Sequence, residues 1–200
     1  MNVGGRAGQA GLTPELLLEA YGAGFFPMAD SREGMIHWYS PDPRGIIPLD
    51  AFHVPRTLRR VVRSARYAIR CDTVFERVMR ECASREETWI SEEIIRAYTG
   101  LHREGYAHSV EAWEENTLAG GLYGVALGAA FFGESMFSLT PDASKVALVA
   151  LVDRLRAGGF TLLDTQFVTA HLRQFGAREI SRREYLELLV RAVRSSGRWL

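Results

Sequence analysis

The spacing of hydrophobic and polar residues changes near residue 106. Before this point it predicts mainly helices, with one short strand at 67–71, and directly after it a run of three strands. In the first half, apolar residues recur at helical intervals over residues 13–24, 54–64, 72–82 and 91–105. In the second half, apolar and polar residues alternate over 107–114, and two apolar strands separated by glycine follow at 118–128 and 129–135. Short turns join these three strands, which therefore predict an antiparallel meander.

Two further segments complete the predicted sheet and its crossover. Residues 143–158 are apolar on nearly all sides, as in a buried helix, and residues 160–167 form an apolar strand that we expect at the centre of the sheet. Three strands, a helix and a strand in this order predict an α+β fold of the N-acyltransferase (GNAT) type, with a mixed sheet and a crossover helix. We expect this catalytic domain at 67–200 and a small N-terminal α/β module at 1–66.

Side chains that cap helix N-termini stand where several predicted helices begin. Thr13 precedes a proline that fits the first helical position. Ser181 and Glu184 form a capping box before the last helix. We also expect the carboxylates of Asp72 and Asp142 to cap the helices that follow them.

The composition is that of a folded globular protein, with 47% hydrophobic and 24% charged residues. The longest uncharged stretch, residues 118–133, contains five glycines and is shorter than the roughly 20 apolar residues of a membrane span. Residues 1–11 contain no apolar signal core, and Cys71 and Cys82 do not need to pair. We therefore expect a cytoplasmic protein in a reducing compartment.

The net charge is zero, but the charges are segregated along the chain. Residues 53–80 hold eight arginines against two acids, residues 84–115 hold three against eight, and residues 170–200 hold seven against three. Four arginines of the first group share one face of the predicted helix at 54–64: Arg56, Arg59, Arg60 and Arg63. Such a stripe is usually a solvated surface, but it also fits the phosphate backbone of a nucleic acid.

Polar side chains at the ends of two apolar strands form the candidate site. Glu134 ends one strand, and Asp164 and Gln166 lie two positions apart at the end of the other. Residues i and i+2 of a strand point to the same face, so Asp164 and Gln166 can face one ligand together. A polar strand end satisfied by turns and caps is the alternative explanation.

Coenzyme A matches this site poorly. In acyl-CoA-dependent members of the fold, a glycine-rich loop at the crossover helix binds the pyrophosphate through free backbone N–H groups. Here no glycine pair follows Glu134, and Asp142 at the start of the helix would repel an anion. None of the five histidines has the spacing of a metal site and neither cysteine has a neighbouring base, so we expect no metal and no thiol nucleophile.

Nine segments, in order from about Tyr21 to Leu189, together resemble the leucyl/phenylalanyl-tRNA–protein transferase family. The most specific are GYAHSVEAW, GESMFS and the D-x-Q strand at residues 164–166. The others are WYSPDPRGIIPLD, FHVPRTLRR, TWI, LAGGLYGVALG, DASKVAL and FGAREISRREYLELL. The family has an N-acyltransferase-like C-terminal domain, which agrees with the predicted strand order.

The resemblance implies an enzyme that takes Leu or Phe, and Met less well, from a charged tRNA without a cofactor. It joins this residue to the α-amine of a protein that begins with Arg or Lys, and so marks that protein for N-degron proteolysis. By match to the family, Gln166 holds the incoming amine, Asp164 orients Gln166, and Glu134 helps to place the basic acceptor. The same match implies an apolar pocket for the aminoacyl side chain at Leu122, Phe131, Met136, Leu151 and Leu163.

The match also implies how the tRNA end is bound. Trp89 stacks on the terminal adenosine, and the arginine face of residues 54–64 holds the acceptor stem. The chain departs from the family at Met28, where many members have tryptophan, and in a shortened N-terminal module. A second aromatic platform is therefore missing or supplied by Trp38 or Tyr39.

Three alternatives remain open at this point. A sister group on the same scaffold attaches Leu to acidic N-termini. A coenzyme A-dependent N-acyltransferase would share the fold, and a non-catalytic RNA-binding protein would use the arginine stripe alone. We expect a monomer in each case.

Overall fold

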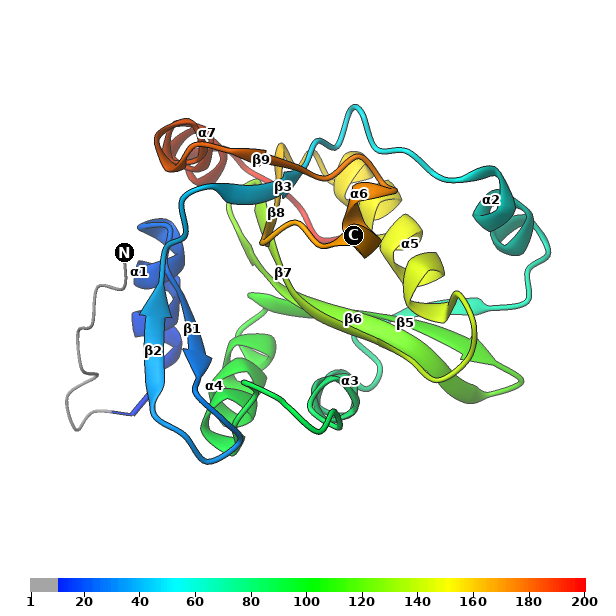
Figure 1. The fold of residues 1–200 in the computed structure, drawn as a ribbon, viewed down its shortest axis with the longest axis horizontal. Coiled ribbons are helices and arrows are strands. Elements are labelled where there is room, and N and C mark those ends of the chain that lie inside the picture. The colour runs from blue at the N-terminus through cyan, green and yellow to red at the C-terminus, as the bar shows by residue number, and fades with distance from the viewer. Residues whose placement is uncertain (1–10) are drawn as a thin grey trace.

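The computed structural model describes residues 11–200, which assemble around a mixed sheet of seven strands (Figure 1). The prediction that the N-terminus lacks an export signal, and that the N-terminal module is shortened there, lies outside the described residues. Within residues 11–200, no helix is long and apolar enough to cross a membrane. The thiols of Cys71 and Cys82 are unpaired, as predicted.

The sheet has the strand order β4-β5-β6-β7-β8-β3-β9. The strands β4, β5, β6 and β7 pair antiparallel, and β8 pairs parallel to β7, as a crossover connection requires. The sheet strands are β3 (Arg44–Ile47), β4 (Ala68–Cys71), β5 (Ala107–Glu114), β6 (Thr117–Leu127), β7 (Ala130–Ser138), β8 (Leu162–Gln166) and β9 (Arg178–Ile180). The predicted α+β class, the meander and the central position of β8 are confirmed.

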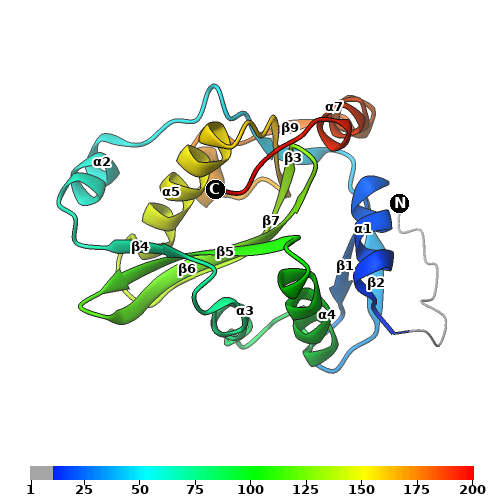
Figure 2. The same cartoon turned by 180° about the vertical axis from the view of Figure 1, so that it is seen from behind.

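Helices cover both faces of this sheet (Figures 1 and 2). The crossover helix α5 (Ala143–Ala157) packs on one face of the sheet. The helix α2 (Arg56–Arg63) packs against α5. The helices α3 (Phe75–Cys82) and α4 (Glu92–Arg103) pack on the other face. Each face therefore has its own apolar core, one beneath α5 and one beneath α3 and α4.

The remaining elements lie at the end of the sheet that holds β3 and β9. The helix α1 (Pro14–Gly22) packs against α4 and leads into a hairpin of β1 (Phe26–Ala29) and β2 (Ile36–Tyr39). The short helix α6 (Ala170–Arg173) and the C-terminal helix α7 (Arg182–Arg194) flank β9.

The strand β3 precedes the predicted domain boundary at residue 66, yet it lies within the main sheet. It pairs antiparallel with β8 on one side and with β9 on the other. The N-terminal part of the chain therefore supplies the strand beside Asp164 and Gln166. The boundary at residue 66 stays a prediction.

The predicted caps at Thr13 and Ser181 are confirmed. The Thr13 hydroxyl accepts from the Leu16 N–H at 3.3 Å, and the Ser181 hydroxyl accepts from the Glu184 N–H at 3.2 Å. Both hydroxyls satisfy N–H groups that a helix leaves free in its first turn.

The predicted caps at Asp72 and Asp142 are wrong. Asp72 lies three residues before α3, and its carboxylate accepts instead from the Ser109 N–H at 2.8 Å and from the Trp199 indole at 2.8 Å. Asp142 has a left-handed backbone, and its carboxylate accepts no N–H of the first turn of α5. It pairs instead with the Lys145 side chain of that helix at 2.7 Å. Spacing alone does not show that a carboxylate has a better partner elsewhere.

Candidate active site

A cavity of about 1030 Å³ lies beside the ends of β7 and β8. Its wall includes parts of the β1–β2 hairpin, the segment before α4, the first turns of α5 and the segment after β8. The exposed surface of the wall is mostly apolar, as is usual for sites that bind organic ligands, although about half of its residues are polar or charged. Glu134 and Gln166 are among these polar residues.

Glu134 and Gln166 are in direct contact across the two parallel strands. The Gln166 side-chain N–H donates to Oε1 of Glu134 at 3.0 Å, and the Tyr21 hydroxyl donates to the same oxygen at 2.7 Å. Tyr21 also contacts the hydroxyl of Tyr98. The other Glu134 oxygen, Oε2, is buried and has no hydrogen-bond partner among residues 11–200.

The environment of Glu134 favours its protonated form. Burial raises the pKa of the Glu134 carboxyl to about 8, and the Tyr21 hydrogen bond acts in the opposite direction. The nearby charge of Asp164 contributes to this raised value. A carboxyl with this pKa exchanges a proton readily near neutral pH.

Asp164 lies behind this pair and is completely buried. The Arg44 guanidinium binds it in a fork, with Nε 3.0 Å from Oδ1 and Nη2 2.6 Å from Oδ2. The Tyr185 hydroxyl donates to Oδ2 at 2.8 Å, and the Gln166 backbone N–H donates to Oδ1 at 2.8 Å. Both oxygens of the Asp164 carboxylate therefore accept hydrogen bonds from side chains or backbone of the described residues.

The prediction that Asp164 and Gln166 face one ligand together is wrong in its geometry. Gln166 lines the cavity, whereas Asp164 points into the protein. The i, i+2 rule holds for a regular strand, but Gln166 has a φ of 57°, in the left-handed region, and its side chain turns away from the face of Asp164. The catalytic roles of these residues stay predictions.

The structure gathers four of the five predicted pocket residues at the cavity. Leu122, Met136, Leu151 and Leu163 line it. Phe131 does not belong to the wall as described over residues 11–200. Phe131 lies five residues before Met136 on β7 and is completely buried. Its ring stacks on the Trp199 ring at a centroid distance of 5.6 Å.

Of the residues predicted to bind the terminal adenosine, some line the cavity and one does not. Trp89 and Met28 line the cavity. Trp38 pairs with Pro27 in the hairpin, whereas Met28 pairs with His37. Cross-strand pairs share a face and neighbouring residues alternate, so Trp38 points to the face opposite Met28. The alternative in which Trp38 supplies the second platform is therefore wrong. That the platform is missing, or is supplied by Tyr39, which pairs with Phe26 on the Met28 face, stays a prediction.

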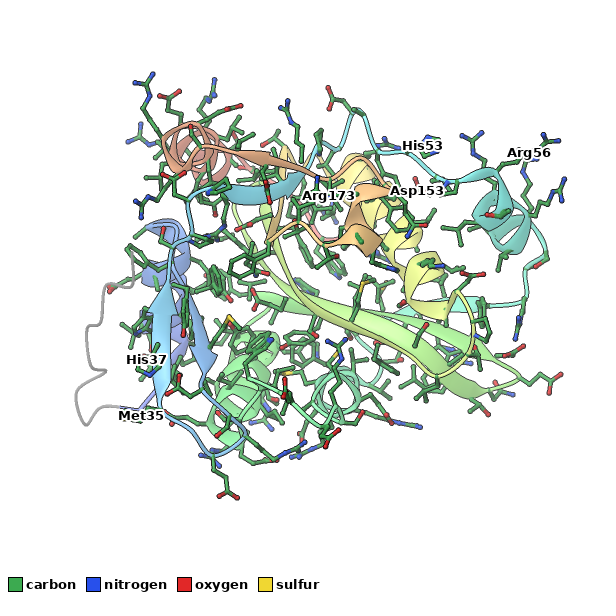
Figure 3. All side chains as sticks on the ribbon, in the orientation of Figure 1. Met35, His37, His53, Arg56, Asp153 and Arg173 are labelled. Carbon is green, nitrogen blue, oxygen red and sulfur yellow. The ribbon has the colours of Figure 1, made fainter. Side chains whose placement is uncertain are left out.

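The arginine face of α2 lies apart from the cavity. Its members Arg56, Arg59, Arg60 and Arg63 are exposed, while Leu58 packs towards α5. Figure 3 shows Arg56 pointing outward at the end of the molecule opposite Met35 and His37 of the hairpin. Among the described residues, α2 contributes no side chain to the cavity wall.

Sequence reasoning missed Arg44, Tyr21 and Tyr185. Tyr21 and Tyr185 occupy apolar helix faces, where an aromatic residue predicts only core packing. Arg44 follows two prolines in an irregular stretch, and its complete burial depends on Asp164, 120 residues later in the chain. A lone arginine beside an apolar strand is the only local signal for it.

Comparisons with known proteins show the family of this chain. A family model described as leucyl/phenylalanyl-tRNA protein transferase matches residues 46–190, and a model of the N-terminal domain of that family matches residues 10–42. A leucyl/phenylalanyl-tRNA–protein transferase from Paramagnetospirillum magneticum is 63% identical over 187 residues, which cover 91% of this chain and 90% of the relative. One from Salinibacter ruber is 55% identical over 188 residues, which cover 94% of this chain and 83% of the relative.

Among solved structures, L-PGS from Bacillus licheniformis aligns with a TM-score of 0.42 and 14% identity. The alignment covers 74% of this chain and 51% of that chain, and a likeness at this level carries no conclusion about function. The family models and the bacterial relatives, in contrast, span nearly the whole chain. The chain therefore belongs to the leucyl/phenylalanyl-tRNA protein transferase family, and it is an aminoacyltransferase.

Proposed function

We propose that this protein moves Leu or Phe from charged tRNA to the α-amine of proteins that begin with Arg or Lys, which directs them to N-degron proteolysis. The observation that carries this proposal is the Glu134–Gln166 pair in the wall of a largely apolar cavity. The apolar wall suits the aminoacyl side chain, and the polar pair suits the amine that attacks it.

The reaction is the aminolysis of an ester. The acceptor nitrogen attacks the carbonyl carbon of the aminoacyl ester, a C–N bond forms and the bond from the carbonyl carbon to the ribose oxygen breaks. The proton lost by the amine ends on that ribose oxygen. The ester is already an activated acyl group, so the chemistry requires positioning and proton transfer and no cofactor or metal.

Glu134 is suited to share a proton with the acceptor. An α-amine has a pKa near 7.7–8.0, and burial places the pKa of Glu134 at about 8. Proton transfer between groups of nearly equal pKa costs little free energy. In this proposal the Glu134 carboxyl takes the proton from the amine and passes it to the leaving ribose oxygen, and the Gln166 amide holds the amine in line with the ester.

The charges of the cavity favour a basic acceptor. Its wall contains the carboxylates of Glu81, Glu134 and Asp142 against the cations of Arg85 and Lys145. Asp142 and Lys145 neutralise each other at 2.7 Å. Glu81 and Arg85 balance each other, so an excess of carboxylate arises when Glu134 is ionised. The ionised form attracts an N-terminal Arg or Lys and repels an N-terminal Asp or Glu.

The aminoacyl side chain would enter between Leu122, Met136, Leu151 and Leu163. These side chains are unbranched at Cβ and adapt in shape, which suits Leu, Phe and Met better than the β-branched Val and Ile. Trp89 would stack on the terminal adenosine, as its place in the cavity wall permits.

The exposed arginines of α2 would hold the tRNA acceptor stem through its phosphates. A single chain supplies every part of this site, so we propose that the protein acts as a monomer. Charged tRNA and nascent proteins occur in the cytoplasm, and we place the reaction there.

We also propose that residues 67–200 form an N-acyltransferase (GNAT) type domain. The meander β5-β6-β7, the helix α5 and the parallel strand β8 support this assignment. Coenzyme A remains a poor donor, because the Ser138 hydroxyl occupies the Ser144 N–H at 3.0 Å in the first turn of α5, where a pyrophosphate would bind.

A two-donor assay tests the proposal. The protein is mixed with a peptide that begins with Arg and with either Phe-tRNA or acetyl-CoA, and the products are identified by mass spectrometry. We expect a peptide extended by one Phe in the first mixture and an unchanged peptide in the second. An acetylated peptide, or no extension with Phe-tRNA, would refute the proposal.

A further inference from the structure

We propose that Arg44 and Tyr185 are positioning residues for the transfer reaction, because they fix, through Asp164, the direction in which Gln166 presents its amide to the cavity. The inference rests on the proposed function, since it explains a geometry that the reaction uses.

The Arg44 guanidinium lies in a slot formed by two aromatic rings, a shape that suits a planar cation. Its guanidinium lies 4.4 Å from the centre of the Tyr185 ring and 4.8 Å from the centre of the Phe26 ring. Its Nη1 donates to the Gly24 carbonyl at 3.1 Å, and the side chain is completely buried. Stacking and a rigid fork of donors are properties of arginine that lysine does not share.

This slot gives the Asp164 carboxylate a single orientation. Both of its oxygens accept from Arg44 in a bidentate pair, which is the most directional contact available to a carboxylate. The Tyr185 hydroxyl donates to Oδ2, and burial together with the Asp164 charge raises the pKa of Tyr185, so it remains a donor.

Asp164 in turn holds the backbone of Gln166. Its Oδ1 accepts the Gln166 backbone N–H at 2.8 Å. Gln166 has a φ of 57°, which residues with side chains rarely adopt without local support.

The neighbouring strand is shaped to allow the same bend. Gly45 lies opposite Gln166, and the register shifts between Gly45 and Ile46. A Cβ on Gly45 would lie 2.7 Å from the backbone carbon of Phe167, so only glycine permits this close approach. Two features of the N-terminal segment, the Arg44 fork and the Gly45 gap, therefore act on one residue of β8.

The bend is what brings Gln166 to Glu134. Without it, Gln166 would share the face of Asp164 and point into the protein, as the strand pattern predicts. With it, the amide lies 3.0 Å from Glu134 at the cavity. Loss of the Arg44 fork should therefore lower the rate of transfer and leave donor binding unchanged, since neither Arg44 nor Tyr185 lines the cavity in the described part of the chain.

A purely structural role predicts a different result. Buried ion pairs often contribute little to stability beyond satisfying each other, and their loss lowers the amount of folded protein whatever residue 166 is. A positioning role acts through Gln166, so its effect disappears when the Gln166 side chain is absent. Double-mutant cycles separate the two cases.

The experiment measures single-turnover transfer of Phe from Phe-tRNA to an Arg-starting peptide by the whole chain. The variants are Arg44→Lys, Gln166→Ala and the double variant, with Arg156→Lys as the matched control. Arg156 also donates to a backbone carbonyl, that of Leu49 at 2.7 Å, and lies 6.0 Å from the Phe52 ring. Thermal unfolding gives the folded fraction of each protein, and donor KM is determined separately. Tyr185→Phe replaces Arg44→Lys in the same cycle if the lysine variant does not fold.

We expect Arg44→Lys to lower the rate by about tenfold or more with donor KM unchanged, since small misplacements of reacting groups have effects of this size. In the Gln166→Ala background the same substitution should have no further effect, and Arg156→Lys should match the parent. Equal effects of Arg44→Lys in both backgrounds, or a folded variant with the parental rate, would overturn the positioning role alone. A parent protein without transfer activity would overturn the proposed function together with it.

Discussion

The Gln166 amide lies 3.0 Å from Oε1 of Glu134, on the neighbouring strand of the sheet. The strand β7 continues past Glu134 to Ser138, so the prediction that Glu134 ends its strand is wrong. Glu134 and Gln166 each lie two residues beyond the parallel pairing of β7 with β8, and the left-handed backbone of Gln166 turns its amide towards the carboxyl. This contact joins the residue that we expect to hold the amine with the residue that we expect to take its proton.

The raised pKa of Glu134 predicts how stability depends on pH. Between the ordinary carboxyl pKa of about 4.5 and the folded value of about 8, the folded state binds a proton that the unfolded state has lost. The free energy of unfolding therefore falls as the pH rises through this window, by up to about 1.4 kcal/mol per pH unit from this group. Urea unfolding at pH 5.5 and pH 8 measures it.

Glu134→Gln is the comparison for that experiment. Glutamine keeps an acceptor for Tyr21 and does not titrate, so we expect the loss of stability between the two pH values to be smaller than in the parent. Identical pH dependence in the two proteins would show that Glu134 ionises in the folded state as easily as in the unfolded one.

Trp89→Ala should weaken donor binding. Stacking on a base contributes about 1–3 kcal/mol, so KM for Phe-tRNA should rise between about 5-fold and 150-fold with little change in kcat. Steady-state kinetics with a fixed acceptor peptide gives both constants. Trp38→Phe is the control, because Trp38 lies on the other face of the hairpin, and an equal rise in KM there would argue against an adenosine platform at Trp89.

Met136→Phe should change the choice of amino acid. A larger side chain in the wall reduces the space for Phe more than for Leu, and pocket changes of this size are worth about 1–3 kcal/mol. We expect the ratio of kcat/KM for Phe-tRNA to that for Leu-tRNA to fall by about tenfold. Phe131→Leu, outside the cavity, should leave the ratio unchanged, and a matching shift there would mean that the pocket is elsewhere.

The arginines of α2 should act on tRNA alone. The double substitution of Arg56 and Arg60 by Gln should raise KM for Phe-tRNA and reduce the slope of log KM against log salt by about 0.7–0.9 for each phosphate that is no longer neutralised. An aminoacyl-adenosine donor, which lacks the acceptor stem, should be used as well as before. The same substitutions at Arg183 and Arg191 of α7 serve as the control, and an equal effect there would indicate non-specific attraction.

Sequence reasoning predicted the elements whose signals are local. The Thr13 and Ser181 caps, the meander and the buried helix α5 follow from residues within a few positions of each other. The errors at Asp72 and Asp142 arose because each carboxylate has another partner. Asp72 binds Trp199, near the far end of the chain, and Asp142 binds the Lys145 side chain of α5 in place of a backbone N–H.

The site was predicted only in part, because some of its side chains are oriented by residues from distant segments. The strand ends and the family motifs identify Glu134 and Gln166. The inward direction of Asp164 depends on Arg44 and Tyr185, which come from distant segments, and the direction of Gln166 depends on a backbone angle that no side-chain pattern records. Phe131 and Trp38 were misplaced because burial and strand alternation, which decide what faces the cavity, depend on the packed structure.

The most direct test of the proposed function uses Phe-tRNA carrying radiolabelled Phe and two peptides that differ only in a first residue of Arg or Asp. We expect label on the Arg peptide, little on the Asp peptide, and loss of transfer in Gln166→Ala with donor KM retained. Label mainly on the Asp peptide would contradict the basic acceptor class, and undiminished transfer by Gln166→Ala would contradict the assigned site.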